Sequence, residues 1–89
     1  MIGYKVMARR NPSELVVYTS RTCGQCWALK SWLERRQIEY REIDIGGDAV
    51  ARQFVRRAAG GYTSVPTVVL PDGRVLVEPS RSDIAAALA

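Results

Sequence analysis

The spacing of apolar residues changes several times along this 89-residue chain, and each change predicts a new element. Residues 14–19 are mostly apolar and rich in β-branched side chains, which is typical of a buried strand. From Gly24 to Arg36 the apolar residues recur every three or four positions, at Cys26, Leu29 and Leu33, so this segment is expected to be helical. Trp32 falls beside this stripe and is expected in the core.

A second strand and a second helix follow. Residues 37–45 alternate apolar and polar side chains, which predicts a strand in which Ile38 and Tyr40 share faces with Ile43 or Ile45 after a slip of register. Asp48 is a plausible N-cap for a helix that runs to Ala58 and ends at Gly60-Gly61. The apolar stripe expected for this helix consists of Val50, Phe54 and Ala58, supported by Ala51 and Val55.

The last third of the chain predicts a hairpin and a final helix. Two β-branched runs, 67–70 and 74–77, flank the turn sequence Pro71-Asp72-Gly73. Ser80 and Asp83 have the spacing of a capping box, and Ile84 and Leu88 would face the core from the helix that follows. The element order is therefore β-α-β-α-β-β-α, an α/β fold with a mixed four-stranded sheet and helices on both faces.

Length and composition indicate one small domain. Residues 1–13 are interpreted as an N-terminal extension and residues 14–89 as the folded domain. The extension lacks the pattern of a signal peptide, and no apolar run approaches the roughly 20 residues that span a bilayer. The sequence thus predicts a cytoplasmic protein without a membrane partner, in a compartment where permanent disulfides are rare.

The net charge of +4 does not by itself indicate nucleic-acid binding. The only tight basic pairs outside the extension are Arg35-Arg36 and Arg56-Arg57, and each precedes a helix-ending signal. Cations in the last turn of a helix are favoured by the helix dipole, which explains both pairs. No nucleic-acid partner is therefore expected.

The two cysteines, Cys23 and Cys26, follow the first predicted strand, at the start of the first predicted helix. Free N–H groups and the helix dipole favour a thiolate at such a position, and Arg21 could add positive potential. Cys23 is therefore predicted to be the nucleophile. Cys26 lies one turn further on and could resolve a mixed disulfide, while Gly24 and Gln25 set the local geometry. A Cys-x-x-Cys pair in this place is the thioredoxin-like arrangement.

Other uses of the cysteine pair stay open. Structural zinc normally needs four cysteine or histidine ligands, and the chain has two cysteines and no histidine. A dimer could still share four thiolates around zinc or an iron–sulfur cluster, and a non-catalytic interaction domain is a further alternative. The interpretation adopted is a monomeric redox enzyme with no bound cofactor.

A second candidate feature is Pro66, directly before the third strand. It could merely mark the boundary of that strand. The sharper prediction is a cis Val65–Pro66 bond, because cis peptides are essentially confined to proline. Such a turn would leave the backbone of Val65 free to pair with an extended substrate beside Cys23.

From Leu15 onward these residues resemble the glutaredoxin family of the thioredoxin superfamily, and within it the mycoredoxins of actinobacteria. The segments that carry the resemblance are VVYTSRTCGQC, IEYREIDI and GGYTSVPTVVLPDGRVLVEPS. The resemblance implies a nucleophilic Cys23 and a cis-proline turn that binds substrate through Val65, Pro66 and Thr67. It also implies disulfide-containing or thiolated proteins as partners.

The same resemblance bears on the small thiol that serves as co-substrate. Typical glutaredoxins carry a Gly-Gly-x-x-Asp segment near the last helix that helps to hold glutathione. Residues 77–83 read Val-Glu-Pro-Ser-Arg-Ser-Asp instead, which is similar to the Asn-Pro-Ser segment of mycoredoxins. This implies mycothiol rather than glutathione, recycled by mycothiol disulfide reductase, with Ser80 and Arg81 near the thiol.

One residue departs from this pattern. Mycoredoxins and glutaredoxins usually place an aromatic residue third in the motif, where this chain has Gln25. Glutamine there resembles the redoxins that thioredoxin reductase reduces and that donate electrons to ribonucleotide reductase. Mycothiol is the co-substrate predicted, and thioredoxin reductase stays the alternative reductant.

Overall fold

The computed structural model describes residues 14–89, and the predicted extension, 1–13, lies outside the described residues. The four strands are β1 (Leu15–Thr19), β2 (Tyr40–Asp44), β3 (Thr67–Val69) and β4 (Val75–Val77). The helices are α1 (Gly24–Arg35), α2 (Ala49–Ala58), α3 (Arg81–Leu88) and the short 3₁₀ helix η1 (Ile45–Gly47). None of the helices in this described part is long and apolar enough to cross a membrane.

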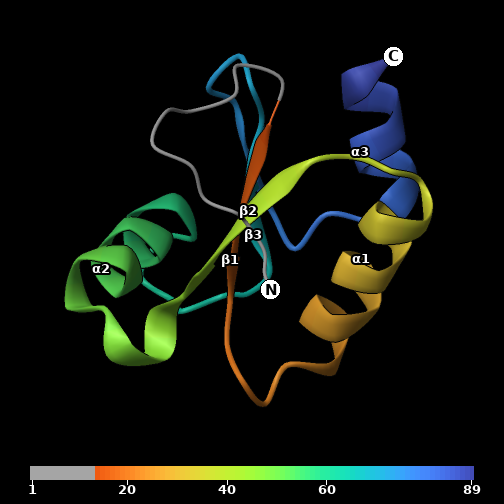
Figure 1. Ribbon diagram of the computed structural model, residues 1–89. Helices are drawn as coiled ribbons and strands as arrows, with labels where there is room; N and C mark the ends of the chain where they lie inside the picture. Colours follow the sequence, from red (N-terminus) through yellow and green to blue (C-terminus); the bar gives the residue numbers. More distant parts are fainter. Residues whose placement is uncertain (1–13) are drawn as a thin grey trace.

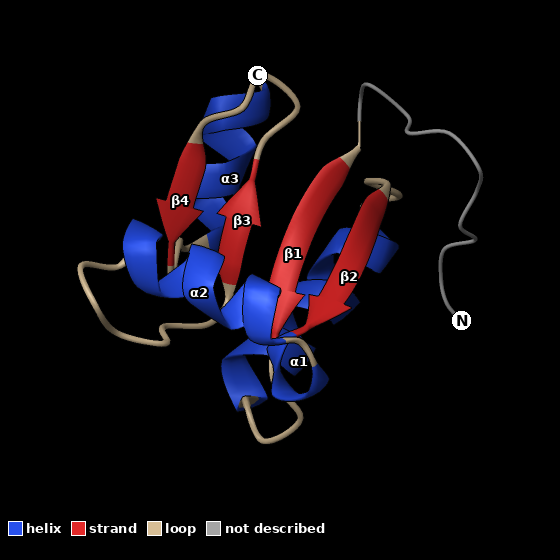
Figure 2. Ribbon diagram, turned by 90° about the vertical axis from the view of Figure 1, so that its left-hand side faces the viewer, coloured by secondary structure: helices blue, strands red, loops and turns tan. Residues whose placement is uncertain are grey.

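The strands form one mixed sheet in the order β2-β1-β3-β4. The central strand β1 runs parallel to β2 and antiparallel to β3, and β3 and β4 form an antiparallel hairpin. Helices α1 and α3 cover one face of the sheet, and α2 covers the other (Figures 1 and 2). The predicted α/β architecture, with its element order and its helices on both faces, is confirmed.

Alternation along β1 creates a separate core on each face of the sheet. Leu15 and Val17 point towards α1 and α3, whereas Tyr18 points towards α2. The larger core comprises Leu15, Val17, Leu29, Trp32, Leu33, Val68, Leu70 and Ile84. The smaller core comprises Ile45, Ala51 and Val55, and the ring of Tyr18 stacks on Phe54 beside it with centroids 4.9 Å apart.

The two cores correct the predicted pattern of β2. Ile38 and Tyr40 pack against the larger core, and Ile43 and Ile45 belong to the smaller one. These residues therefore lie on opposite faces, and no slip of register is needed to account for them. The strand also begins at Tyr40 rather than at residue 37, because Gln37 adopts a left-handed conformation (φ 57°) that ends α1.

Some outer positions of α2 and α3 were assigned to the core wrongly. Val50 is 81% exposed and Ala58 is also exposed, so α2 is anchored through Ala51, Phe54 and Val55. In α3, Leu88 is 38% exposed, and Ala87 packs against the core together with Ile84. In both helices the buried face is narrower than the run of apolar residues suggests.

The predicted caps fix where α2 and α3 begin. The carboxylate of Asp48 accepts a hydrogen bond from the Ala51 N–H at 3.0 Å. Ser80 and Asp83 form the reciprocal capping box, with bonds of 3.0 and 2.9 Å. These contacts are local in sequence, and such side chains satisfy N–H groups that the first turn leaves unpaired.

Candidate active site

Cys23 is the N-cap residue of α1, at the end of the loop that leaves β1. Its backbone is extended (φ −94°, ψ 105°), and its Sγ accepts a hydrogen bond from the Cys26 N–H at 3.0 Å. The thiol is partly exposed to solvent. A helix N-terminus that donates to a sulfur stabilises negative charge on it, which suits Cys23 to nucleophilic attack.

Cys26 faces inward from the first turn of α1 and is only 1% exposed. Both cysteines are free thiols in this structure. Burial, reinforced by the hydrogen bond with Cys23, raises the pKa of the Cys26 thiol to about 12. The two thiols are therefore unequal: one is accessible, and the other is held protonated beneath it.

The turn before β3 closes the other side of the site. The Val65–Pro66 bond is cis, as the sequence predicted, and the Val65 carbonyl oxygen lies 3.7 Å from Cys23 Sγ. Pro66 and Thr67 are buried, and the Thr67 hydroxyl donates to the Ser64 carbonyl at 2.7 Å. Residues 42 positions apart in sequence thus meet at the nucleophilic sulfur.

Comparison with known proteins agrees with this geometry. The glutaredoxin family profile matches residues 15–76. The chain belongs to the glutaredoxin family. Its members are thiol–disulfide oxidoreductases that work with a thiol co-substrate such as glutathione, so the protein is assigned this general activity.

Named relatives are found in two groups of bacteria. Two proteins of Mycobacterium tuberculosis that are named as glutaredoxins, one from strain CDC 1551 and one from strain H37Rv, are each 40% identical to this chain over 74 residues. The matched residues cover 83% of this chain and 88% of each relative. A glutaredoxin-named protein of Synechocystis is 30% identical over 63 residues, covering 71% of this chain and 72% of its own.

Solved structures support the fold. A variant of the thioredoxin-like protein BC3987 superposes with a TM-score of 0.73 at 31% identity, covering 84% of this chain and 99% of that one. The glutaredoxin of Archaeoglobus fulgidus superposes with a TM-score of 0.65 at 20% identity, covering 90% and 96% of the two chains. The thioredoxin-like fold expected from the sequence is thereby confirmed.

The segment before α3 lies beside the cis-proline turn of this glutaredoxin. The Glu78 N–H donates to the Pro66 carbonyl at 2.8 Å, just beyond the point where Val77 pairs with Thr67. Ser80 and Arg81 follow at the start of α3, and both are exposed. The Ser80 hydroxyl already caps α3, which leaves the cation of Arg81 as the more available of the two groups.

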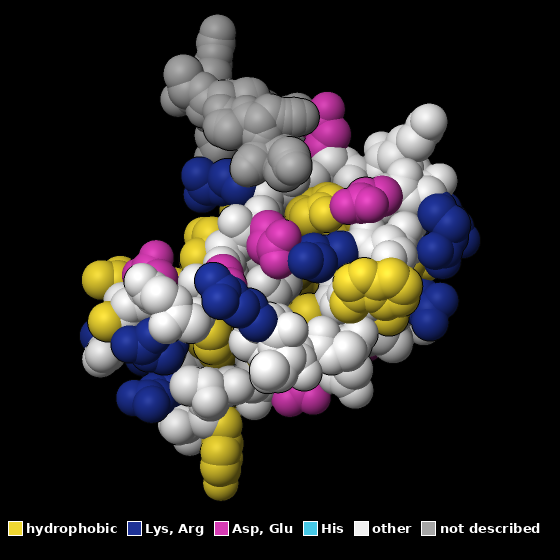
Figure 3. Space-filling model, turned by 60° about the horizontal axis from the view of Figure 1, so that its bottom comes forward, with side chains coloured by type: hydrophobic (Ala, Val, Ile, Leu, Met, Phe, Trp, Pro, Cys, Tyr) yellow, Lys and Arg dark blue, Asp and Glu magenta, His cyan; other side chains and the backbone are white. Residues whose placement is uncertain are grey.

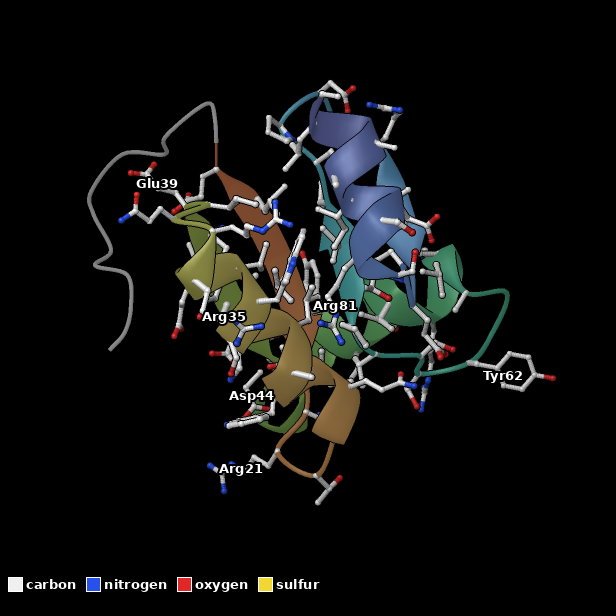
Figure 4. All side chains as sticks on the ribbon, turned by 90° about the vertical axis from the view of Figure 1, so that its right-hand side faces the viewer. Arg21, Arg35, Glu39, Asp44, Tyr62 and Arg81 are labelled. Carbon is white, nitrogen blue, oxygen red and sulfur yellow. The ribbon has the colours of Figure 1, made fainter. Side chains whose placement is uncertain are left out.

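Arg21 and Gln25 stand at the outer rim of the site. Arg21 lies in the loop between β1 and α1 and forms an ion pair with Asp44 at 3.4 Å, with its side chain 89% exposed (Figure 4). The guanidinium group of Arg21, which the sequence predicted to add positive potential at Cys23, is therefore paired with the carboxylate at the end of β2. Gln25 is exposed between the two cysteines, in the first turn of α1.

The surface around this end of the molecule is mixed in character. Figure 3 shows Lys and Arg side chains interspersed with Asp, Glu and hydrophobic groups rather than gathered into one basic patch. Trp27, directly after Cys26, is 70% exposed there. Across residues 14–89, no group of three or more His, Cys, Asp or Glu is placed to hold a metal ion.

Sequence reasoning missed a polar cluster on the inner side of α1. Lys30 and Glu34 have the four-residue spacing of a pair along one helix face, but each contacts β2 instead. Lys30 contacts Glu42, and Glu34 accepts a hydrogen bond from the Tyr40 hydroxyl. Nothing in the local sequence marks a partner on another element.

The inequality of the two thiols gives a first testable prediction. Because burial raises the pKa of Cys26 to about 12, its thiol is protonated at pH 7, and its thiolate fraction rises as the pH increases towards that value. Iodoacetamide should therefore modify the reduced native protein once, at Cys23, and labelling of Cys26 should increase as the pH rises. Peptide mapping by mass spectrometry measures both sites.

Denatured protein is the control, since unfolding removes the burial and both cysteines should then react. Equal labelling of both cysteines in the native protein at pH 7 would contradict the burial and the protonation of Cys26.

Proposed function

We propose that this glutaredoxin reduces mixed disulfides between proteins and a low-molecular-weight thiol, namely mycothiol, in the cytoplasm. The observation that carries the proposal is the position of Cys23. Its sulfur is bonded to the first turn of α1, partly open to solvent, and 3.7 Å from the Val65 carbonyl. A substrate disulfide lying along the cis-proline turn would present its sulfur to this nucleophile.

The proposed reaction has two steps. The Cys23 thiolate attacks the mycothiol sulfur of the mixed disulfide, so that a Cys23–mycothiol disulfide forms and the protein partner leaves as a thiol. A second mycothiol then attacks the mycothiol sulfur, which frees Cys23 and forms mycothiol disulfide. Alternatively, Cys26 attacks the Cys23 sulfur, which releases mycothiol and closes the Cys23–Cys26 disulfide.

Two observations favour mycothiol as the co-substrate. The 40%-identical relatives come from a mycobacterium, in keeping with the actinobacterial resemblance of the sequence. The segment from Glu78 to Ser80 also lacks the glycine pair that helps typical glutaredoxins to hold glutathione. We propose that Arg81, exposed at the start of α3, contributes a cation towards this co-substrate.

Gln25 favours a second candidate. This residue lies exposed between the cysteines, where a reductase would contact the disulfide, and it is the residue that resembles redoxins fed by thioredoxin reductase. On that alternative the protein would cycle only between its dithiol and its Cys23–Cys26 disulfide, and would need no small thiol.

The two candidates differ in the reductant that opens the Cys23–Cys26 disulfide. Oxidised protein is supplied with NADPH and either mycothiol plus mycothiol disulfide reductase or thioredoxin reductase alone, and NADPH consumption is followed. We expect rapid turnover with the mycothiol system only, and glutathione with its own reductase is the matched control. Rapid turnover with thioredoxin reductase alone would contradict the proposal and favour the second candidate.

A further inference from the structure

The polar cluster between α1 and β2 holds one lysine in a defined place. The Thr19 hydroxyl donates to Glu42 Oε2 at 2.7 Å, and Lys30 Nζ contacts the same oxygen at 2.8 Å. Thr19 is 1% exposed at the end of β1, and the side chain of Lys30 is 26% exposed. Three elements thus fix an ammonium group that would otherwise sample many rotamers in water.

This lysine lies next to the buried cysteine. Lys30 follows Cys26 by four residues on α1, so the two side chains project from the same face of the helix, one turn apart. The groups that act on the Cys26 sulfur are the Cys23 thiol, the backbone of Ser20 and the charge of Lys30. Burial has the largest effect on the pKa of Cys26 and raises it, whereas the charge of Lys30 lowers it by less than the Cys23 thiol and the Ser20 backbone change it.

Glu42 holds the ammonium group of Lys30 in place. Its Oε2 is taken up by Thr19 and Lys30 together, and the hydroxyl of Thr19 stabilises the carboxylate from the side of the sheet. Glu42 therefore acts as the anchor of the cluster, and Lys30 is the charged member that shares a helix face with Cys26.

We propose that Lys30 is a positioning residue for the resolving step, and that its ammonium group, held by Glu42 and Thr19, stabilises the thiolate that Cys26 must form. The inference rests on the proposed function, and within it on the route in which Cys26 attacks the mixed disulfide at Cys23. In that step Cys26 loses its proton to solvent and its sulfur bonds to the Cys23 sulfur. The bond to the departing thiol breaks, and that thiolate carries away the electron pair.

A chromogenic disulfide makes the resolving step visible. Reduced protein is mixed in a stopped-flow instrument with 5,5′-dithiobis(2-nitrobenzoate). Attack by Cys23 releases one coloured thiolate, and attack by Cys26 on the resulting mixed disulfide releases the second. The first phase reports Cys23 and serves as the internal reference, whereas the second phase reports Cys26.

The informative variants change the charge of Lys30 with little change of shape. Lys30→Gln keeps a hydrogen-bond donor for Glu42, Lys30→Met keeps the apolar stem, and Lys30→Arg keeps the charge. Arg35→Met is the matched control, because it removes a cation from the same helix nine residues beyond Cys26, about 13.5 Å along the helix axis at 1.5 Å per residue.

Both uncharged variants should slow the second phase at pH 7 and move its pH profile to higher pH. The expected loss is about threefold for each pKa unit, because tenfold less thiolate is partly offset by its greater nucleophilicity. Lys30→Arg should restore most of the rate, and Arg35→Met should leave both phases unchanged. The first phase should stay the same in all four variants.

Two outcomes would overturn the inference, and they are distinguishable. An unchanged rate and pH profile of the second phase in Lys30→Gln and Lys30→Met would show that the cluster only ties α1 to β2. A second phase absent from the unmodified protein would remove Cys26 from the reaction and overturn the inference, while leaving the route in which a second mycothiol frees Cys23.

Discussion

Replacing Cys23 by serine is expected to abolish all disulfide-reducing turnover, down to the background rate of the assay. The accessible sulfur at the start of α1 is the only thiol in the site that a substrate can reach, since Cys26 is 1% exposed and held protonated. Thiol–disulfide exchange requires a thiolate, which a serine hydroxyl cannot supply. NADPH consumption coupled to a mycothiol-modified protein measures the loss.

The fold should survive this change. Serine is a favoured N-cap residue, so its hydroxyl can accept the Cys26 N–H bond that the sulfur of Cys23 accepts now. An unchanged circular dichroism spectrum would therefore accompany the loss of activity. Residual turnover in a folded Cys23→Ser protein would mean that Cys26 can act alone, contrary to its burial.

Replacing Cys26 by serine should instead separate two kinds of substrate. Turnover of mixed disulfides with mycothiol should persist, because Cys23 attacks first and a second mycothiol can complete the cycle. Reduction of a disulfide within a protein should fall to background, because no inner thiol remains to release the trapped partner. The same coupled assay, run with each substrate in turn, measures the split.

Loss of both activities in Cys26→Ser would contradict this account and point to a mechanism that uses only the dithiol. That result would agree with the second candidate, in which thioredoxin reductase is the reductant. The unmodified protein and Cys23→Ser bracket the measurement as its upper and lower limits.

The sequence predicted those features of the fold that depend on neighbouring residues. The caps at Asp48 and Ser80 were recognisable because a capping side chain bonds to N–H groups only two or three residues away. The position of Cys23 was recognisable from the Cys-x-x-Cys spacing at the start of a helix, and the cis bond at Pro66 mainly from the family resemblance, since a proline there could also have marked only a strand boundary.

Features that depend on distant partners were not predicted. Ile43 and Ile45 were placed with Ile38 and Tyr40, because one strand pattern cannot reveal that the sheet has a core on each face. Val50 was assigned to the core from its four-residue spacing to Phe54, although it lies on the outer side of α2 at 81% exposure. Apolar type indicates what can be buried, and only packing decides what is.

In the candidate site, too, contacts between residues far apart in sequence could not be predicted from local spacing. The approach of the Val65 carbonyl to Cys23 follows from a family resemblance rather than from spacing, since 42 residues separate the two positions. The bond from Lys30 to Glu42 has no signal in the sequence, where Glu34 is the obvious partner four residues away. The roles of Arg21, Gln25, Ser80 and Arg81 remain predictions.

The central claim is that Cys23 takes the small thiol from a mixed disulfide, and trapping the intermediate tests it most directly. Cys26→Ser protein is mixed with a mycothiol-modified protein, quenched with acid and analysed by intact mass and peptide mapping. The account predicts one mycothiol bound through a disulfide to Cys23, with the partner released as a free thiol. A disulfide between Cys23 and the partner protein, or no adduct at Cys23, would contradict it.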